Sequence, residues 1–170
     1  MVNFGDYDTL SVTVWLRRAA STTSDRSELL ARLRELERDG VIQDLSVNNW
    51  SKQIECDPEY RVHGSNEEIR HRLAEFQDWA DEEGHELEPA FRWCETTSLA
   101  TDETKEVVTL PVTCIEVRGD GELLAVFPCT SDGNTNSVAD CVTGLEKLAA
   151  HADDSVAEQA ESTGRPPSGR

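Results

Sequence analysis

The sequence predicts an α+β protein in which three helices pack on a mixed β-sheet of about five strands. Several short segments alternate apolar and polar residues, as strands with one buried face do. Three longer segments carry apolar residues at helical spacing, and turn-forming residues separate the segments. Helices on one face of the sheet would give a two-layer sandwich, for which a ferredoxin-like core is the nearest common architecture.

The first third of the chain predicts a βαβ unit. Alternation over residues 10–17 indicates a strand. Residues 25–39 combine a capping box with a stripe of leucines, and the following Gly40 is typical of a helix C-cap. Alternation returns over residues 41–50. Two strands joined through a helix are expected to be parallel, with a right-handed crossover.

The middle of the chain predicts a loop, a helix and a strand in that order. Residues 55–65 favour a loop, and residues 65–84 carry the spacing of a second helix. Residues 87–96 indicate a strand with two aromatic residues, and Pro89 places the start of this strand at a sheet edge.

The next segments predict a central strand and a hairpin. Residues 107–117 are apolar at both alternating sets of positions, which is typical of a strand buried on both faces. Asp120 and Gly121 form a strong hairpin signal, and residues 122–129 would return as the partner strand.

The C-terminal part predicts a final helix and a tail. A turn at residues 131–134 leads to apolar residues at helical spacing over 138–148. From His151 onward, small polar residues and two prolines favour a disordered segment. The sequence therefore predicts one α+β domain over residues 1–150 and a disordered polar tail over 151–170.

The charge pattern indicates a protein of a halophilic cytoplasm. The net charge is −18, from 34 acidic and 16 basic residues, and only three of the basic residues are lysines. Molar salt screens the self-repulsion of such a chain. No segment predicts a membrane span or a leader. Five cysteines without a CxxC pair indicate buried thiols in a reducing compartment.

Four runs of the sequence resemble a family of small haloarchaeal proteins, usually described as helix-turn-helix domain proteins, whose function is largely unassigned. The runs are LSVTVWLRR, LLARLRELERDGVIQDLSV, RLAEFQDWADEEG and VVTLPVTCIEVRGDGELLAVFPCTSDG, and the likeness covers residues 10–148. The stretch ELLARLRELERDGVI is similar to part of a winged helix. A helix-turn-helix joins its helices by a short turn, whereas about 25 residues separate the first two predicted helices, so no DNA-contacting residues are inferred.

The sequence gives no indication of an enzyme, a cofactor or a metal. It contains no phosphate-binding glycine loop, no G-x-S-x-G, no HExxH and no dinucleotide fingerprint. Cys56, His63 and His71 are spaced by seven and eight residues, which matches no standard zinc arrangement.

Two tryptophan–basic pairs form the candidate binding site. Trp15 and Arg17 occupy the outer face of the first strand, and Trp50 and Lys52 the outer face of the second, if the apolar positions of each strand face the helices. A third ring, Phe91 or Trp93, would join them. Aromatic rings interleaved with cations on an open sheet form a stacking platform for single-stranded nucleic acid. The alternatives are cover by another layer, a homodimer interface or a small-molecule site.

The first forty residues differ in charge from the rest. They hold six arginines and seven acids, which leaves a net charge of −17 for residues 41–170. Arg32 and Arg34 of this segment are further candidates for contact with a polyanion, and ion pairs along a helix are the alternative. The leading hypothesis is a non-catalytic, transcription-related or nucleic-acid-binding regulator. The alternative is a homodimeric interaction module or small-molecule sensor that does not bind nucleic acid.

Overall fold

A computed structural model describes residues 4–18, 24–55 and 65–163 of the chain. The elements in order are η1 (Phe4–Asp6), β1 (Leu10–Arg17), α1 (Ser24–Arg38), β2 (Asp44–Trp50), β3 (Gln53–Glu55), α2 (Ser65–Glu83), β4 (Arg92–Thr97), β5 (Thr104–Thr109), β6 (Thr113–Gly119), β7 (Glu122–Phe127), β8 (Cys129–Ser131), β9 (Asn134–Asn136) and α3 (Val138–Thr163). The predicted α+β class, with a mixed sheet and three helices among the described residues, is confirmed.

The main sheet has the strand order β2-β1-β6-β7. β1 and β2 are parallel and joined through α1, as predicted. β6 pairs antiparallel with β1, and β7 with β6. A ferredoxin-like fold contains a split βαβ unit, with another strand between the two parallel strands. Here β1 and β2 are direct neighbours, so the sheet differs from that expectation.

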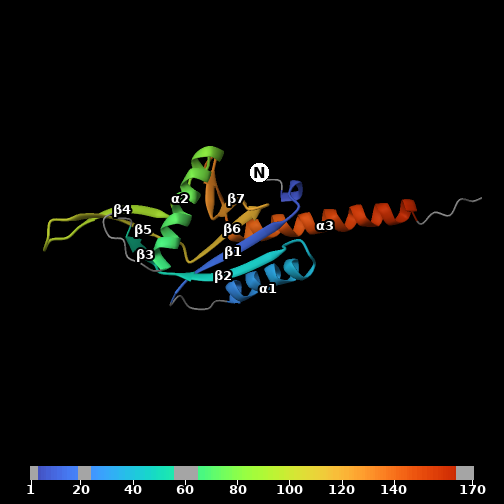
Figure 1. Cartoon of the computed structure of the whole chain (residues 1–170), viewed down its shortest axis with the longest axis horizontal. Coiled ribbons are helices and arrows are strands. Elements are labelled where there is room, and N and C mark those ends of the chain that lie inside the picture. The colour runs from blue at the N-terminus through green and yellow to red at the C-terminus, as the bar shows by residue number, and fades with distance from the viewer. Residues whose placement is uncertain (1–3, 19–23, 56–64, 164–170) are drawn as a thin grey trace, which may run out of the picture.

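The two faces of the main sheet are both covered by helices. Val12 and Val14 of β1 pair with Val117 and Ile115 of β6, and all four side chains are buried. α1 and α3 contact each other on this side. α2 lies on the other side, where it contacts β7 and reaches Glu116 of β6 (Figure 1). The expected two layers therefore become three, because α2 does not join the other helices.

A second sheet has the order β3-β5-β4. Its β4–β5 hairpin projects from the body as an arm (Figure 1). The prediction of one central strand over 107–117 is wrong, because this run divides between β5 and β6, which belong to different sheets. Pro111, which has no backbone N–H to donate to a ladder, lies between the two strands.

The predicted hairpin at Asp120 and Gly121 is confirmed, with φ angles of 51° and 86°. These left-handed conformations match the twist of the paired strands. β7 ends at Phe127, just before a proline. The predicted turn at 131–134 lies inside the small β8–β9 hairpin rather than at the start of a helix.

α3 begins after a capping box that was not predicted from the sequence. Ser137 Oγ accepts from the backbone N–H of Asp140 (3.2 Å), and the Asp140 carboxylate accepts from the N–H of Ser137 (2.8 Å). The helix extends to Thr163, so it enters the segment for which a polar tail was expected.

Candidate ligand-binding cleft

Trp15 and Trp50 share one face of the sheet, as the sequence predicts. Their rings stack with centroids 5.3 Å apart and 16° between their planes. Phe91 meets Trp50 edge-on at 6.0 Å, and Trp93 stacks on Phe91 at 6.2 Å. The expected neighbouring rings are therefore present in one aromatic cluster.

The hypothesis of an open aromatic platform is wrong, and the alternative of cover by another part of the same chain is the one that the structure shows. Trp15 is 3% exposed and Trp50 is 1% exposed within a single chain. Phe91 links Trp50 to Phe76 of α2, with ring centroids 6.1 Å apart between the two phenylalanines. The indole N–H of Trp50 donates to the carbonyl O of Pro111 (3.1 Å). A platform for nucleobases needs open rings, so the two tryptophans are core residues.

Arg17 and Lys52 lie where the main sheet meets the second sheet. Arg17 is half-buried, and its guanidinium donates to the carbonyl O of Leu110. The N–H of Leu110 donates to the carbonyl O of Lys52 (2.8 Å), whose side chain is exposed. Arg17 therefore has a structural contact, and Lys52 lies beside tryptophans whose rings are buried.

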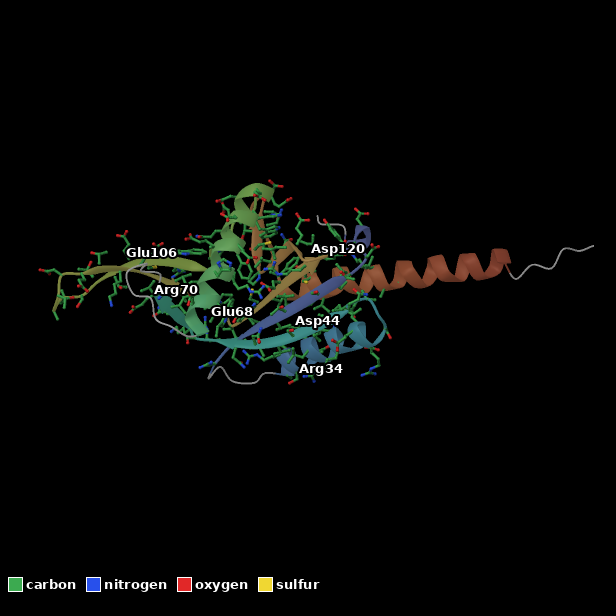
Figure 2. All side chains as sticks on the ribbon, in the orientation of Figure 1. Arg34, Asp44, Glu68, Arg70, Glu106 and Asp120 are labelled. Carbon is green, nitrogen blue, oxygen red and sulfur yellow. The ribbon has the colours of Figure 1, made fainter. Side chains whose placement is uncertain are left out.

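Arg32 and Arg34 lie on α1, away from the tryptophans. Arg32 forms an ion pair with Glu146 of α3, and this hydrogen bond raises the pKa of Arg32. Arg34 is exposed, on the side of the sheet opposite α2 (Figure 2). The structure thus does not bring the six candidate residues together into one site.

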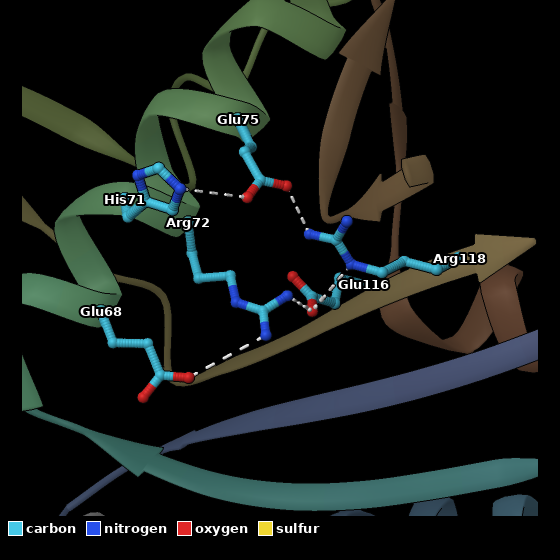
Figure 3. A network of polar contacts seen from close by, with 6 residues as sticks. All are labelled: Glu68, His71, Arg72, Glu75, Glu116 and Arg118. Atoms are coloured by element: carbon cyan, nitrogen blue, oxygen red, sulfur yellow. Dashed lines mark hydrogen bonds and ion pairs between the residues drawn. The ribbon is translucent and has the colours of Figure 1, made fainter. Parts of the chain in front are cut away.

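A network of charged side chains joins α2 to β6. Glu116 is 0% exposed and is the buried charged residue of the described part of the chain. Arg72 Nη1 donates to Glu116 Oε1 (2.8 Å), and Arg118 Nη2 donates to Glu75 Oε2 (2.6 Å) (Figure 3). Arg118 Nε also lies 3.5 Å from Glu116 Oε1. Two arginines thus face two carboxylates between the helix and the strand.

The environment shifts the pKa values of Glu116 and Glu75 in opposite directions. Burial raises the pKa of Glu116, against the opposing effect of the nearby Arg72 and Arg118. The hydrogen bond from Arg118 lowers the pKa of Glu75. These contacts join α2 to β6, while Glu116 Oε2 and Arg118 Nε are buried without a hydrogen-bond partner among the described residues.

A cleft of about 530 Å³ lies between α3 and the β7 side of the main sheet. Its volume falls within the range of roughly 300–1,000 Å³ that is usual for small-molecule sites. Most of its wall is apolar, and it comes from η1, the C-terminal part of α2, β7, the β8–β9 hairpin and α3. The apolar side chains are Phe4, Trp79, Ala125, Phe127 and Leu148.

His85 contributes an imidazole ring to this mostly apolar wall. Its ring stacks on Trp79, with centroids 4.9 Å apart and 24° between the planes. Trp79 is itself fixed, because its indole N–H donates to the carbonyl O of Leu124 (2.9 Å). His85 Nδ1 is buried and has no hydrogen-bond partner among the described residues. Leaving such an atom unpaired is costly. Because Nδ1 itself has almost no accessible surface, the His85 ring would have to turn before a ligand in the cleft could bond to it.

The polar residues of the cleft are largely fixed by the protein. Asn136 Nδ2 donates to Ser131 Oγ (3.2 Å) and contacts Cys129 Sγ (3.7 Å). Asp140 caps α3, and Lys147 is the lysine of the wall. The wall thus holds one acid and one lysine, which suits a ligand without a large net charge.

The two cysteines of the wall add apolar surface rather than reactivity. Cys129 and Cys141 are buried, and burial raises the pKa of both thiols, so they stay protonated. The sequence expectation of buried thiols holds for these two and for Cys114, whereas Cys94 is exposed and Cys56 lies outside the described residues.

Gly144 widens the cleft at the middle of its helical wall. A glycine inside a helix costs about 1 kcal/mol relative to alanine. A Cβ atom at Gly144 would meet only Phe4 Cε2, at an ordinary contact distance of 3.8 Å. Packing within the chain therefore does not require a glycine here, and its effect is to leave space in the cleft.

No metal centre is formed by the described residues: they contain no group of three or more His, Cys, Asp or Glu side chains placed to hold an ion. Three residues were considered as zinc ligands from the sequence, and two of them, Cys56 and His63, lie outside the described residues. His71 lies on α2 with its Nε2 3.9 Å from Glu75 Oε1.

The fold and the cleft define an α+β protein with a ligand-sized cavity beside a long C-terminal helix. The family model described as "helix-turn-helix domain" matches residues 6–150, and the chain belongs to this family. No curated protein and no solved structure matches the chain. Among the described residues, no helix is both long and apolar enough to cross a membrane.

The geometry differs from what the family's description suggests. In the described part of the chain, β2 and β3 separate α1 from α2, and six strands separate α2 from α3. No two of these helices are joined by the three- or four-residue turn of a DNA-binding helix-turn-helix.

Sequence reasoning missed the cleft residues. Trp79 belongs to the apolar stripe of α2 and His85 follows its C-cap, so each has an ordinary structural explanation. Gly144 is the one sequence signal available, because an isolated glycine within a helical pattern often has a packing or functional reason.

Proposed function

We propose that this protein is a non-catalytic regulator of a halophilic cytoplasm that binds a small, uncharged, largely apolar molecule in the cleft beside α3. The single observation that carries the proposal is the lining of the cleft. Phe4, Trp79 and Phe127 line it together with the His85 ring, and a glycine inside α3 leaves room beside them. Membership of a helix-turn-helix domain family supports a regulatory role.

The proposal is tested with the neutral fluorescent dye N-phenyl-1-naphthylamine in about 2 M KCl, where charge repulsion is screened. Wild-type protein is expected to enhance the dye's emission saturably, with one dye per chain. Gly144→Phe fills the cleft and is expected to weaken dye binding by at least about tenfold, or roughly 1.4 kcal/mol.

Gly144→Ala is the matched control, because it changes the same helix position while adding one methyl group. It is expected to bind dye within about threefold of wild type and to raise stability by about 1 kcal/mol. Circular dichroism verifies that both variants are folded. Equal dye binding by wild type and by folded Gly144→Phe, or no binding by wild type, would contradict the proposal.

A second candidate function is nucleic-acid binding, which the family description favours. Trp15 and Trp50 are buried in the core. The candidate surface for nucleic acid is therefore α1, where Arg34 is exposed. A mobility-shift assay in molar KCl with single- and double-stranded oligonucleotides tests it. Binding that Arg34→Glu weakens would support this function, whereas absence of binding by wild type, or binding that Arg34→Glu leaves unchanged, counts against a contact through α1.

A further inference from the structure

The two edges of the main sheet differ in how they are covered. At the β7 edge, Trp79 Nε1 donates to the carbonyl O of Leu124, and α2 packs against the strand. β2 forms the other edge, and in the described part of the chain no strand pairs with its outer side. An open edge presents backbone donors and acceptors to a further strand.

The outward-facing positions of β2 can be assigned from its hydrogen bonds. Pairing with β1 is regular over the whole strand, without a bulge. The N–H of Arg18 donates to the carbonyl O of Trp50, so Trp50 and every second residue before it face β1. Leu45, Val47 and Asn49 therefore direct their backbone groups away from the sheet. Leu45 agrees with this assignment, because its N–H donates to Glu37 Oε2 of α1 (3.0 Å).

Apart from Asp44 at its start and the Glu37 carboxylate bonded to Leu45, this edge lacks the features with which proteins usually protect an edge strand. Such strands carry charges, prolines or bulges that discourage pairing. Residues 45–50 contain no charged side chain and no proline, although 29% of the chain is charged. Val47, at the centre of the strand, is 39% exposed and is one of three exposed large hydrophobic residues in the described part of the chain.

We propose that a second copy of this chain pairs with β2, antiparallel, about a two-fold axis at Val47. The pairing joins two four-stranded sheets into one of eight strands. Val47 faces its own copy, and Leu45 faces Asn49 of the other chain, so no like charges are opposed. A second copy fits because an uncharged strand can pair with itself in this symmetric register.

Two charge effects make this association depend on salt. Each chain carries a net charge of −18, so two copies repel one another strongly in dilute buffer and much less in molar salt. In addition, the Glu37 carboxylate occupies the Leu45 N–H in the single chain and must leave it when the strands pair. Glu37→Ala removes this acceptor and is therefore expected to favour the paired form.

The test is the molar mass of the full chain by size-exclusion chromatography with light scattering in about 2 M KCl. Wild type is expected to give twice the monomer mass, and Val47→Lys is expected to halve it. Leu99→Lys makes the same change at the most exposed apolar residue, which lies on the β4–β5 arm, and is expected to remain dimeric. Asn49→Lys repeats the test at a second outward position, should Val47→Lys fail to fold.

Amide hydrogen exchange gives an independent readout of the same contact. The N–H groups of Val47 and Asn49 are expected to exchange slowly in the wild-type dimer and at least about tenfold faster in a folded monomeric variant. A monomeric wild type, a folded Val47→Lys or Asn49→Lys that stays dimeric, or a Leu99→Lys that becomes monomeric would overturn the proposal.

Discussion

The indole rings of Trp15 and Trp50 stack on each other across two parallel strands, with their centroids 5.3 Å apart. Both side chains are buried, and Phe91 lies edge-on against Trp50. The pair is therefore a packing unit that joins the main sheet to the second sheet. Because these rings are buried, the candidate functional site is the cleft beside α3 and not the tryptophan face.

Removal of Trp50 is predicted to destabilise the fold. Trp50→Ala leaves a cavity between Trp15 and Phe91 and is expected to lower the free energy of unfolding by about 4 kcal/mol. Lys52→Ala, at the neighbouring exposed position, is expected to change it by less than about 0.5 kcal/mol. Urea denaturation in molar KCl measures both values. A loss below about 1 kcal/mol for Trp50→Ala would mean that the ring is not packed as described.

Loss of the partner of the buried carboxylate is predicted to be costly as well. Arg72→Met leaves the buried Glu116 without its 2.8 Å donor and is expected to cost about 3 kcal/mol of unfolding free energy. Glu68→Gln removes only an exposed contact 3.9 Å from Arg72 and is expected to cost less than about 0.5 kcal/mol. The two variants are compared by denaturation at neutral pH, and equal losses would argue against a specific role for Glu116.

The ion pair of Glu75 with Arg118 predicts a dependence of stability on pH. The pKa of Glu75 is lower in the folded chain than its ordinary value of 4.5, because Arg118 donates to it. The folded state therefore gains stability from this carboxylate above pH 4.5 and loses it as the pH falls through the folded pKa. Burial raises the pKa of Glu116, so its contribution to stability has the opposite sign. This carboxyl group favours the folded state more when it is protonated.

Glu75→Gln isolates the first effect. The variant is expected to be less stable than wild type at neutral pH, by up to about 1 kcal/mol because Glu75 is partly exposed. The difference is expected to shrink as the pH falls below 4.5. Denaturation curves for both proteins across this range measure it, and a constant difference at every pH would contradict the assignment.

The β4–β5 arm predicts a local dependence on salt. Glu95 and Glu106 lie directly opposite each other in this antiparallel pair. Like charges in such positions repel, by about 0.5 kcal/mol in dilute buffer. Glu106→Lys is expected to slow amide exchange in the arm in about 0.1 M KCl, with a much smaller effect in about 2 M KCl. Glu103→Lys makes the same change in net charge near the tip, and equal effects of both variants would exclude a specific role for the pair.

The sequence predicts the first βαβ unit well because its periodicities are local. Alternation over residues 10–17 and the leucine stripe of α1 define both elements and their buried faces, and this placed Trp15 beside Trp50. The burial of these rings could not be predicted, because Phe91 and Phe76, which cover them, come from segments far along the chain. A periodicity reports which face is apolar and does not report what packs on it.

The cleft is harder to predict for a related reason. Its wall combines η1, the end of α2, β7, the β8–β9 hairpin and α3, which become neighbours only when the fold is complete. The predicted strand over 107–117 failed at Pro111, and the β8–β9 hairpin was too short to give a periodic signal. Local patterns therefore could not assign the strands to their sheets. The position of the cleft depends on that assignment.

The indole N–H resonances of the four tryptophans test the central claim most directly. In a ¹H–¹⁵N spectrum recorded in molar KCl, the dye N-phenyl-1-naphthylamine is expected to shift the Trp79 indole resonance. Those of Trp15 and Trp50, in the core, and of Trp93, on β4, are expected to stay in place. Trp79→Phe assigns the shifted peak. A saturable shift confined to Trp79 is the predicted result, whereas an unchanged Trp79 peak, or shifts at Trp15 and Trp50 instead, would contradict binding in the cleft.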